Sequence, residues 1–346
     1  VSDNTKVSLT ESGNIATVTG LQLGETTITV RAKDGSNVSA SATIKVVAVP
    51  ASSITLAGTS TTTLKERETN QLTATVSPEN TTYPDVEWSS SDTKVATVDQ
   101  NGLVTAIAKG NAVITAKVIK TPNVTAQYSL TVEALLLGDS NDDKEVDVFD
   151  VVNIANYIVG KNPTPFCFVA SDVIWDKTIN VADQSATVNL ALGLPVEQPS
   201  KVPSRYMNAN TGRLIVGELR ATSEGKVVVP VSISSDIKYS SLQADMMIPE
   251  GMEIVSVRTT PKASNHSLMY NVTDEGVLKV VMYSMENSAL PSFEDNVLEL
   301  VIDANGKTGI LDIDNIFAST PDCSLFNLEF EGCEISNPSS VDGLLR

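Results

Sequence analysis

The stretch Asp139-Ser-Asn-Asp-Asp-Lys-Glu-Val-Asp-Val-Phe-Asp150 places oxygen-bearing side chains at positions 1, 3, 5, 9 and 12 of twelve residues. These side chains belong to Asp139, Asn141, Asp143, Asp147 and Asp150. Glu145 at position 7 can add its backbone carbonyl oxygen. Six of the twelve residues are acidic, and carboxylates held this close repel one another without a cation between them. We therefore expect the stretch to be poorly ordered without metal.

The spacing is that of an EF-hand-type calcium loop, in which a hard cation takes six or more oxygens at about 2.3–2.6 Å. We expect Ca²⁺ at this loop, with Asp147 acting through water. Two positions depart from the EF-hand pattern, because Asp150 replaces the bidentate Glu and Lys144 replaces the Gly of position 6. Residues 134–138 read as a strand end and linker, so the usual first helix is missing. The apolar stripe from Val151 to Val159, closed by Gly160, predicts a helix after the loop.

A second copy of this register begins at Asp172, 33 residues after Asp139. Ile174 replaces the oxygen ligand of position 3, and Lys177 again replaces Gly. The remaining candidate ligands are Asp172, Asp176, Thr178, Asn180 and Asp183. One Ca²⁺ site is expected in the first loop, while the second loop is expected to bind more weakly or not at all. The sequence of residues 184–192 predicts another helix. Trp175 either fills the space that a calcium ion would take in the second loop or makes a surface contact.

Paired calcium loops with Asp at position 12, each followed by a single helix, resemble the dockerin family. The resemblance covers residues 134–195 and implies a small α-helical module that binds a cohesin. In dockerins, loop positions 10 and 11 help to contact the cohesin. By that resemblance the candidate interface residues are Val148 and Phe149 in the first copy and Val181 and Ala182 in the second. Two placements remain open for Phe149. Its side chain either lies in an interface with a partner, or packs into the module's own core or onto the Ig-like domain.

Residues 1–133 contain a repeat of short β-branched runs separated by Gly and Asn, which predicts strands and tight turns. The string W-S-S-S-D-x-x-V-A-T-V-D-x-x-G-x-V-T-A, beginning at Trp88, resembles the bacterial Ig-like group 2 family. The resemblance implies small β-sandwich spacers. We predict a complete domain at 50–133 and a partial domain at 1–49 whose first strands are missing. Trp88 is interpreted as a core aromatic of the sandwich.

A Pro-rich linker at residues 196–210 precedes a second β-rich region, 211–346. Nine candidate strands predict a two-sheet jelly-roll sandwich: 213–222, 226–234, 241–248, 252–257, 268–272, 277–283, 296–303, 310–317 and 325–330. A resemblance to the cohesin family lies in the amino-acid sequence of this region. Residues 225–234 and 242–257 resemble the opening strands of that family, and residues 276–284 continue the likeness. A carbohydrate-binding jelly roll is the related alternative. Such modules usually expose coplanar aromatics, whereas this region has no Trp and scattered Tyr and Phe.

The whole-chain composition excludes several functions. A net charge of −18 and a pI near 4.4 argue against nucleic acid and anionic membranes as partners. No apolar run is long enough to span a bilayer. His266 is the one histidine and lies in a predicted exposed loop, so neither a zinc site nor a Ser-His-Asp triad is expected. Cys167, Cys323 and Cys333 are expected to be free, mostly buried thiols.

The sequence thus predicts a mainly β, multidomain chain without catalytic activity, read as a piece of a longer exported bacterial protein. The first hypothesis is an adhesion or assembly segment that binds a protein partner, in another chain or within this one, through its dockerin-like or cohesin-like surface. The alternative is the carbohydrate-binding tail of an extracellular polysaccharide-degrading enzyme. We further predict that the dockerin-like module packs against a flanking β-sandwich of the same chain, because short linkers keep its local concentration high.

Overall fold

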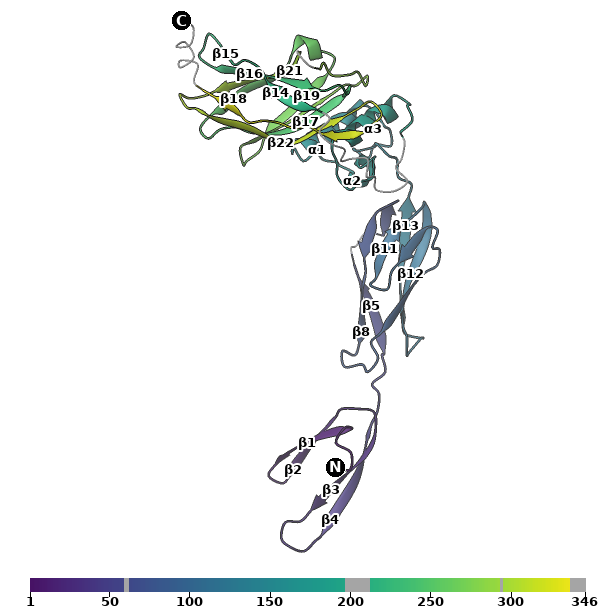
Figure 1. Cartoon of the computed structure of the whole chain (residues 1–346). Coiled ribbons are helices and arrows are strands. Elements are labelled where there is room, and N and C mark those ends of the chain that lie inside the picture. Colours follow the sequence, from purple (N-terminus) through teal and green to yellow (C-terminus); the bar gives the residue numbers. More distant parts are fainter. Residues whose placement is uncertain (59–61, 197–211, 293–294, 337–346) are drawn as a thin grey trace. The chain divides into compact units, whose positions relative to one another are not determined.

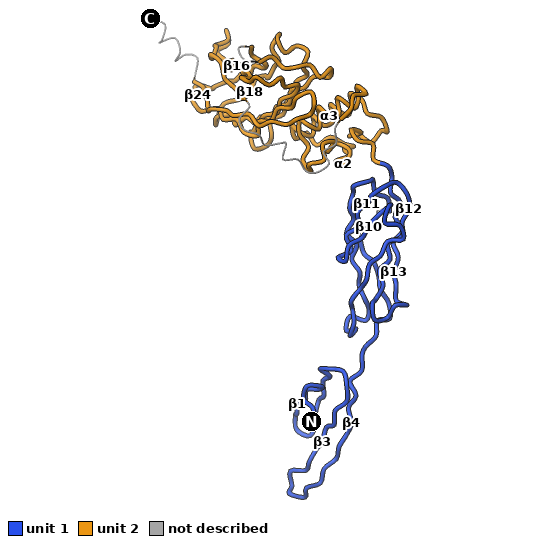
Figure 2. The backbone as a smooth tube through the Cα atoms, turned by 45° about the vertical axis from the view of Figure 1, so that its right-hand side comes forward, with its two compact units in different colours: residues 1–134 blue, residues 135–346 orange. Residues whose placement is uncertain are grey.

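The computed structural model describes residues 1–58, 62–196, 212–292 and 295–336, and it is mainly β. The chain divides into two compact units, Val1–Ala134 and Leu135–Arg346 (Figures 1 and 2). The predicted linker at 196–210 lies outside the described residues from residue 197 onward. None of the described helices is long and apolar enough to cross a membrane.

The first 47 residues of unit 1 form two hairpins that bury few side chains. The strands are β1 (Val7–Ser12) with β2 (Ile15–Gly20), and β3 (Gly24–Arg31) with β4 (Ser39–Val46). Both hairpins are antiparallel, as the alternating pattern predicts; residues 13–14 connect the first pair of strands and residues 32–38 the second. Ile15 and Val30 are 72% and 65% exposed, so these strands have little core of their own.

The rest of unit 1 is a small sandwich with its own apolar core. One side is the sheet β10 (Ala96–Val98), β11 (Leu103–Ala106), β7 (Thr69–Gln71), and the other is β6 (Thr63–Lys65), β13 (Thr125–Glu133), β12 (Gly110–Val118), β9 (Val86–Ser90). The strands β5 (Ser53–Ala57) and β8 (Thr73–Ser77) pair separately. Trp88 is buried, which confirms its core role. Gly102 has φ +83°, and a Cβ there would lie 2.9 Å from the Trp88 ring, so only glycine fits.

Unit 2 begins with a helical module, residues 135–196, whose helices are α1 (Val148–Ile158), α2 (Phe168–Ser171) and α3 (Val181–Ala191). Both long helices begin three residues before the predicted starts. The reason is that loop position 9 is the N-cap in each copy, Asp147 and Asn180, and position 12 closes a capping box as the third helical residue. The helix α2 was not predicted from the sequence.

The second part of unit 2 is a sandwich of a five-stranded and a six-stranded sheet. The first contains β14 (Arg213–Val216), β15 (Arg220–Ala221), β16 (Val227–Ser234), β21 (Asn296–Asp303) and β18 (Glu253–Thr259). The second contains β19 (Ser267–Val272), β20 (Val277–Tyr283), β17 (Ser241–Met247), β22 (Gly309–Ser319), β23 (Leu325–Asn327) and β24 (Cys333–Ile335). Alternate side chains such as Leu242 and Met246 fill the space between the sheets, which confirms the predicted two-sheet sandwich.

The predicted count of nine strands is wrong for this sandwich, because one expected strand is divided and a short strand, β24, follows the last expected one. The first expected strand breaks between β14 and β15. The last one ends at Asn327, because Glu329 leaves β22 and its backbone pairs with Gly212 and Leu214 in the other sheet. The chain then returns to β22 as β24. Such a crossing between sheets does not disturb the alternation of apolar residues, so the pattern could not reveal it.

Candidate metal loops and docking surface

The first loop is folded by its own carboxylates. The Asp139 side chain accepts hydrogen bonds from the backbone N–H groups of Asp143 and Lys144, at 3.0 and 3.1 Å. At the other end, Asp150 Oδ1 accepts from the N–H groups of Ser140 and Asn141, at 2.8 and 3.1 Å. Positions 1 and 12 therefore fix the backbone so that the loop closes on itself.

The second loop repeats most of this pattern, including the bonds from positions 5 and 6 to position 1 and from position 3 to position 12. Asp172 accepts from the N–H groups of Asp176 and Lys177, both at 3.0 Å. Asp183 accepts from the N–H groups of Ile174 and Asn180, at 2.9 and 3.1 Å. The two stretches that the sequence identifies as copies therefore form the same loop.

The lysines at position 6 adopt the backbone conformation of the glycine that they replace. Lys144 has φ +78° and Lys177 has φ +72°, both in the left-handed region. An L-residue with a side chain pays roughly 1–2 kcal/mol for this conformation. The departure from the EF-hand pattern thus leaves the course of the loop intact but adds strain.

Three carboxylates converge in the second loop. One oxygen from each of Asp172, Asp176 and Asp183 lies within 4.8 Å of the others, and no other such group occurs among the described residues. Burial, together with the nearby Asp176 and Asp172 carboxylates, raises the pKa of Asp183 well above its usual value. An all-oxygen set of this kind fits a hard divalent cation. In the first loop, the Asn141 amide instead donates to Asp143 Oδ2 at 2.8 Å.

The two residues that replace typical ligands in the second loop have different surroundings. Ile174 at position 3 is 2% exposed and belongs to the apolar core of the module. Trp175 is 48% exposed, so it does not plug the centre of the loop. The oxygen missing at position 3 is therefore replaced by a packing residue, and the space for an ion remains lined by carboxylates.

The helical module packs on the outer face of the six-stranded sheet, where α3 contacts β17, β20 and β22 and α1 contacts β20 (Figure 1). Val181 and Val188 of α3 share one buried apolar cluster with Val281, Tyr283 and Leu325 of the sheet. This confirms the prediction that the module packs against a flanking sandwich of the same chain. We call this face of the sheet, lined by Ser241, Val281, Tyr283, Cys323 and Leu325, the docking face.

Polar side chains join the module to the docking face. Ser185 Oγ lies 3.0 Å from Ser241 Oγ, which also donates to the Val181 carbonyl at 3.3 Å. Asn189 donates to the Pro321 carbonyl at 3.0 Å, and its own Oδ1 accepts from Asn287 at 2.7 Å.

Asn189 also donates to Cys323 Sγ at 3.3 Å. Burial beneath α3 raises the pKa of the Cys323 thiol to about 12. The side-chain oxygens of Gln184 and Gln243 are buried and have no hydrogen-bond partner among the described residues. The contact is thus more polar than a domain core.

The four predicted interface residues fall into two groups. Val181 and Ala182 are completely buried, whereas Val148 and Phe149 are 45% and 67% exposed. Phe149 therefore does not pack into the core of its own module. Sequence reasoning missed Ser185 and Asn189, which make the polar contacts. The sequence of this helix has no apolar stripe to indicate which face is buried. In the structure all residues from 181 to 189 are buried, so its polar side chains must find partners.

Two other expectations can be compared with the structure. None of the three cysteines is assigned to a disulfide, in line with the prediction of thiols, although only Cys323 is buried and the other two are half-buried. The predicted exposure of His266 is wrong, since its side chain is 5% exposed. The ring is held between Asn265 Oδ1 and the Ser288 carbonyl, and burial lowers its pKa.

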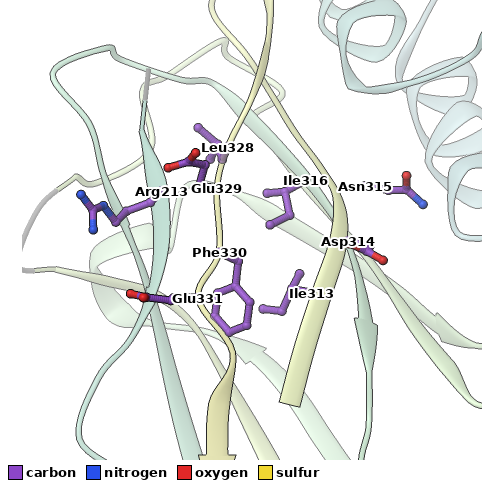
Figure 3. A pocket seen from close by; sticks show the side chains of 9 residues that line it. All are labelled: Arg213, Ile313, Asp314, Asn315, Ile316, Leu328, Glu329, Phe330 and Glu331. Atoms are coloured by element: carbon purple, nitrogen blue, oxygen red, sulfur yellow. The ribbon is translucent and has the colours of Figure 1, made fainter. Parts of the chain in front are cut away.

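An open groove runs beside β22 where the chain crosses between the sheets (Figure 3). It is lined by Arg213, Ile313, Asp314, Asn315, Ile316, Leu328, Glu329, Phe330 and Glu331. Phe330 is the one aromatic residue of this lining, and it packs against the sandwich core. The groove therefore has no pair of coplanar aromatics on which a sugar ring could stack.

Residues 48–132 match the family of bacterial Ig-like domains (group 2), a non-catalytic type of module. An uncharacterized protein of Clostridium acetobutylicum is 35% identical over 153 residues, which cover 44% of this chain and 15% of that protein. An alpha-L-arabinofuranosidase of Bifidobacterium longum is 42% identical over 73 residues, 21% of this chain and 7% of that protein. The chain thus spans a small fraction of these relatives.

Among solved structures, a non-cellulosomal cohesin from Archaeoglobus fulgidus is 17% identical and is matched over its whole length, with 40% of this chain covered. The TM-score between the two chains is 0.32.

Proposed function

We propose that the chain is a non-catalytic segment of an exported bacterial protein that mediates adhesion or protein–protein assembly. In this proposal a calcium-stabilised dockerin-like module and a cohesin-like sandwich are carried on Ig-like spacers. The observation that supports it best is the seat of α3 on the docking face. Two modules whose sequences resemble a known docking pair contact each other there through Ser185, Ser241 and Asn189.

Calcium has a defined place in this proposal. Asp139, Asn141, Asp143, Asp147 and Asp150, with the Glu145 carbonyl, would hold one ion. Asp172, Asp176 and Asp183, with Asn180 and the Thr178 carbonyl, would hold a second. The bound cation would supply positive charge that offsets the repulsion between carboxylates at the start of each helix. The residues themselves fix the loop backbone through the hydrogen bonds described above.

The melting temperature of the full chain in EDTA and in millimolar calcium tests the metal assignment. Binding at 100 times Kd stabilises a folded state by about 2.7 kcal/mol, so a rise of several degrees is expected for the module. Asp139→Ala with Asp150→Ala should abolish the contribution of the first loop, and Asp172→Ala with Asp183→Ala that of the second. Asp274→Ala, an exposed carboxylate on the sandwich, is the matched control. The same melting temperature in both buffers rules calcium out.

A carbohydrate-binding tail is the second candidate, because one relative is named as an alpha-L-arabinofuranosidase. The groove beside β22 is the place to examine, and Arg213→Ala with Glu331→Ala would remove two of its polar groups. Affinity electrophoresis in gels with and without arabinan separates the candidates. Retardation of the wild-type chain that is lost in the double variant would favour the carbohydrate role over assembly.

A further inference from the structure

We infer that Lys279 and Asn315 become joined by a covalent amide bond between their side chains, with Asp245 as the carboxylate that transfers protons between them. The inference goes beyond the proposed function and does not depend on it. It starts from a hydrogen-bonded cluster on the outer face of the six-stranded sheet, where the three side chains come from the neighbouring strands β20, β17 and β22.

The cluster is centred on one oxygen atom. Asp245 Oδ2 accepts from Lys279 Nζ at 2.9 Å and from Asn315 Nδ2 at 3.0 Å. Asp245 lies on the middle strand, directly opposite Lys279 in the register of β17 with β20. The outer two of three adjacent strands are about 10 Å apart, a distance that the long arm of a lysine and the short arm of an asparagine cover together. The amine and the carboxamide are therefore neighbours at the same carboxylate.

The backbone of β22 is irregular where Asn315 enters the cluster. Its register with β17 shifts between Gln243 and Asp245, and Asn315 has φ +48°. Ile313 and Ile316 both pack into the core between the sheets, so the two residues between them lie on the other side of β22 (Figure 3). In a regular strand Asn315 would point inward, two residues after Ile313. The β-bulge thus turns its carboxamide outward to Asp245, as bulges near functional sites do.

The cluster is better shielded from water than a surface ion pair. The side chain of Asp245 is 10% exposed and that of Lys279 is 30% exposed. The stem of Lys279 passes beside Gly160, where a Cβ would lie 3.9 Å from Lys279 Cδ. Water, the competing nucleophile, is therefore partly kept from the reacting groups. Asn315 lies at the exposed end of the cluster, which leaves a way out for a released nitrogen.

The three groups can carry out an amide exchange without another reactant. Asp245 takes a proton from the Lys279 ammonium group, and the neutral amine attacks Cγ of Asn315. The Nζ–Cγ bond forms and the Cγ–Nδ2 bond breaks, while Asp245 returns its proton to Nδ2 and a second proton follows from Nζ. The released nitrogen leaves as ammonium. One positive charge enters and one leaves, the new amide keeps the third proton, and Asp245 regains its starting state.

Another lysine–carboxylate pair of the sandwich lacks the third group. Lys226 pairs with Asp303 beside the five-stranded sheet. Asn305 donates to Asp303 through its backbone N–H, whereas its side-chain amide donates to the Gly251 carbonyl. The carboxamide is thus engaged elsewhere, and Lys226 supplies the matched control.

The experiment is the intact mass of the purified, folded full chain, followed by peptide mapping. We expect the wild type to be lighter than its sequence by one ammonia and to give a cross-linked peptide that contains Lys279 and Asn315. Lys279→Arg keeps the charge beside Asp245, and Asn315→Gly keeps the positive φ without strain, yet both should have the full mass of their sequences. Lys226→Arg should retain the ammonia loss and the cross-linked peptide.

Asp245→Asn tests the proton transfer, because it keeps the shape of the side chain but cannot accept a proton. The bond should not form in this variant, and circular dichroism checks that it folds. If the folded wild type has its full mass, the three groups form only an ion pair and a hydrogen bond, and the inference is wrong.

Two further outcomes would also overturn it. One is an ammonia loss that persists in Lys279→Arg or maps to Asn305-Gly306, because a succinimide at an Asn-Gly pair removes the same mass. The other is a bond that forms as completely in Asp245→Asn as in the wild type, since Asp245 would then have no part in the reaction. Neither outcome bears on calcium or on assembly, so the proposed function is tested separately.

Discussion

Replacing Asn189 by alanine tests how strongly α3 is held on the sandwich. Asn189 is 4% exposed and makes two strong contacts across the interface, to the Pro321 carbonyl and from Asn287. Alanine leaves neither partner without a hydrogen bond, because Asn287 also donates to Pro321 at 2.9 Å. The cost is therefore two net hydrogen bonds, about 2 kcal/mol of docking free energy with no added penalty for a buried orphan.

A loss of about 2 kcal/mol raises the undocked fraction roughly 30-fold. If docking and undocking are fast relative to alkylation by N-ethylmaleimide, the labelling rate of Cys323, which is buried beneath α3, should rise by the same factor in calcium. Asn111→Ala is the matched control, since that exposed asparagine on β12 of unit 1 accepts a single side-chain hydrogen bond, from Thr131. A rise of less than threefold for Asn189→Ala, with the control unchanged, would refute the view that these bonds hold the module in place.

Three further outcomes are expected. Lys144→Gly and Lys177→Gly should each stabilise the calcium-loaded chain by about 1 kcal/mol, because both positions have positive φ; a lower melting temperature would contradict the assigned loop backbone. Burial lowers the pKa of His266, so the unfolded chain binds its proton first as pH falls below about 6.5. The free energy of unfolding should therefore fall between pH 7 and pH 5 more in wild type than in His266→Gln, and equal slopes would be contrary evidence. Trp88→Ala should cost the Ig-like domain about 3–5 kcal/mol in denaturant unfolding, and a cost below 1 kcal/mol would exclude a core role.

The sequence predicted the elements of this chain better than their boundaries and contacts. The two loops were found because the pattern of an EF-hand-type loop fixes the spacing of oxygen-bearing residues, and both stretches form the same kind of turn in the structure. The helices begin three residues before the predicted starts because Asp147 and Asn180, predicted only as ligands, are also the N-caps. Both roles use the same side-chain oxygens, so a ligand at position 9 also indicates a helix beginning at position 10.

The polar seat of α3 could not be predicted from apolar periodicity. Gln184, Ser185 and Asn189 are typical of an exposed helix face, yet all three are buried. Gln184 donates to the Val151 carbonyl within the module, whereas the partners of Ser185 and Asn189 belong to the sandwich, 56 or more residues away in sequence, and no local pattern pairs them. The burial of His266 has the same origin, because the Ser288 carbonyl that receives its hydrogen bond comes from a different loop.

The asymmetry between the two loop–helix copies follows from the side chains at equivalent positions. The copies share most of their loop hydrogen bonds, such as the one from the N–H of position 3 to the Asp of position 12, so the loop backbone alone does not decide which copy packs on the sheet. At the second helical position the first copy has Phe149 and the second has Ala182, whose side chain is 0% exposed. A phenylalanine in the place of Ala182 would have to enter a filled space, and overpacking a core by several carbon atoms costs more than one well-placed contact returns. The second copy can therefore lie flat on the docking face, and the first copy keeps its larger apolar side chain at the surface.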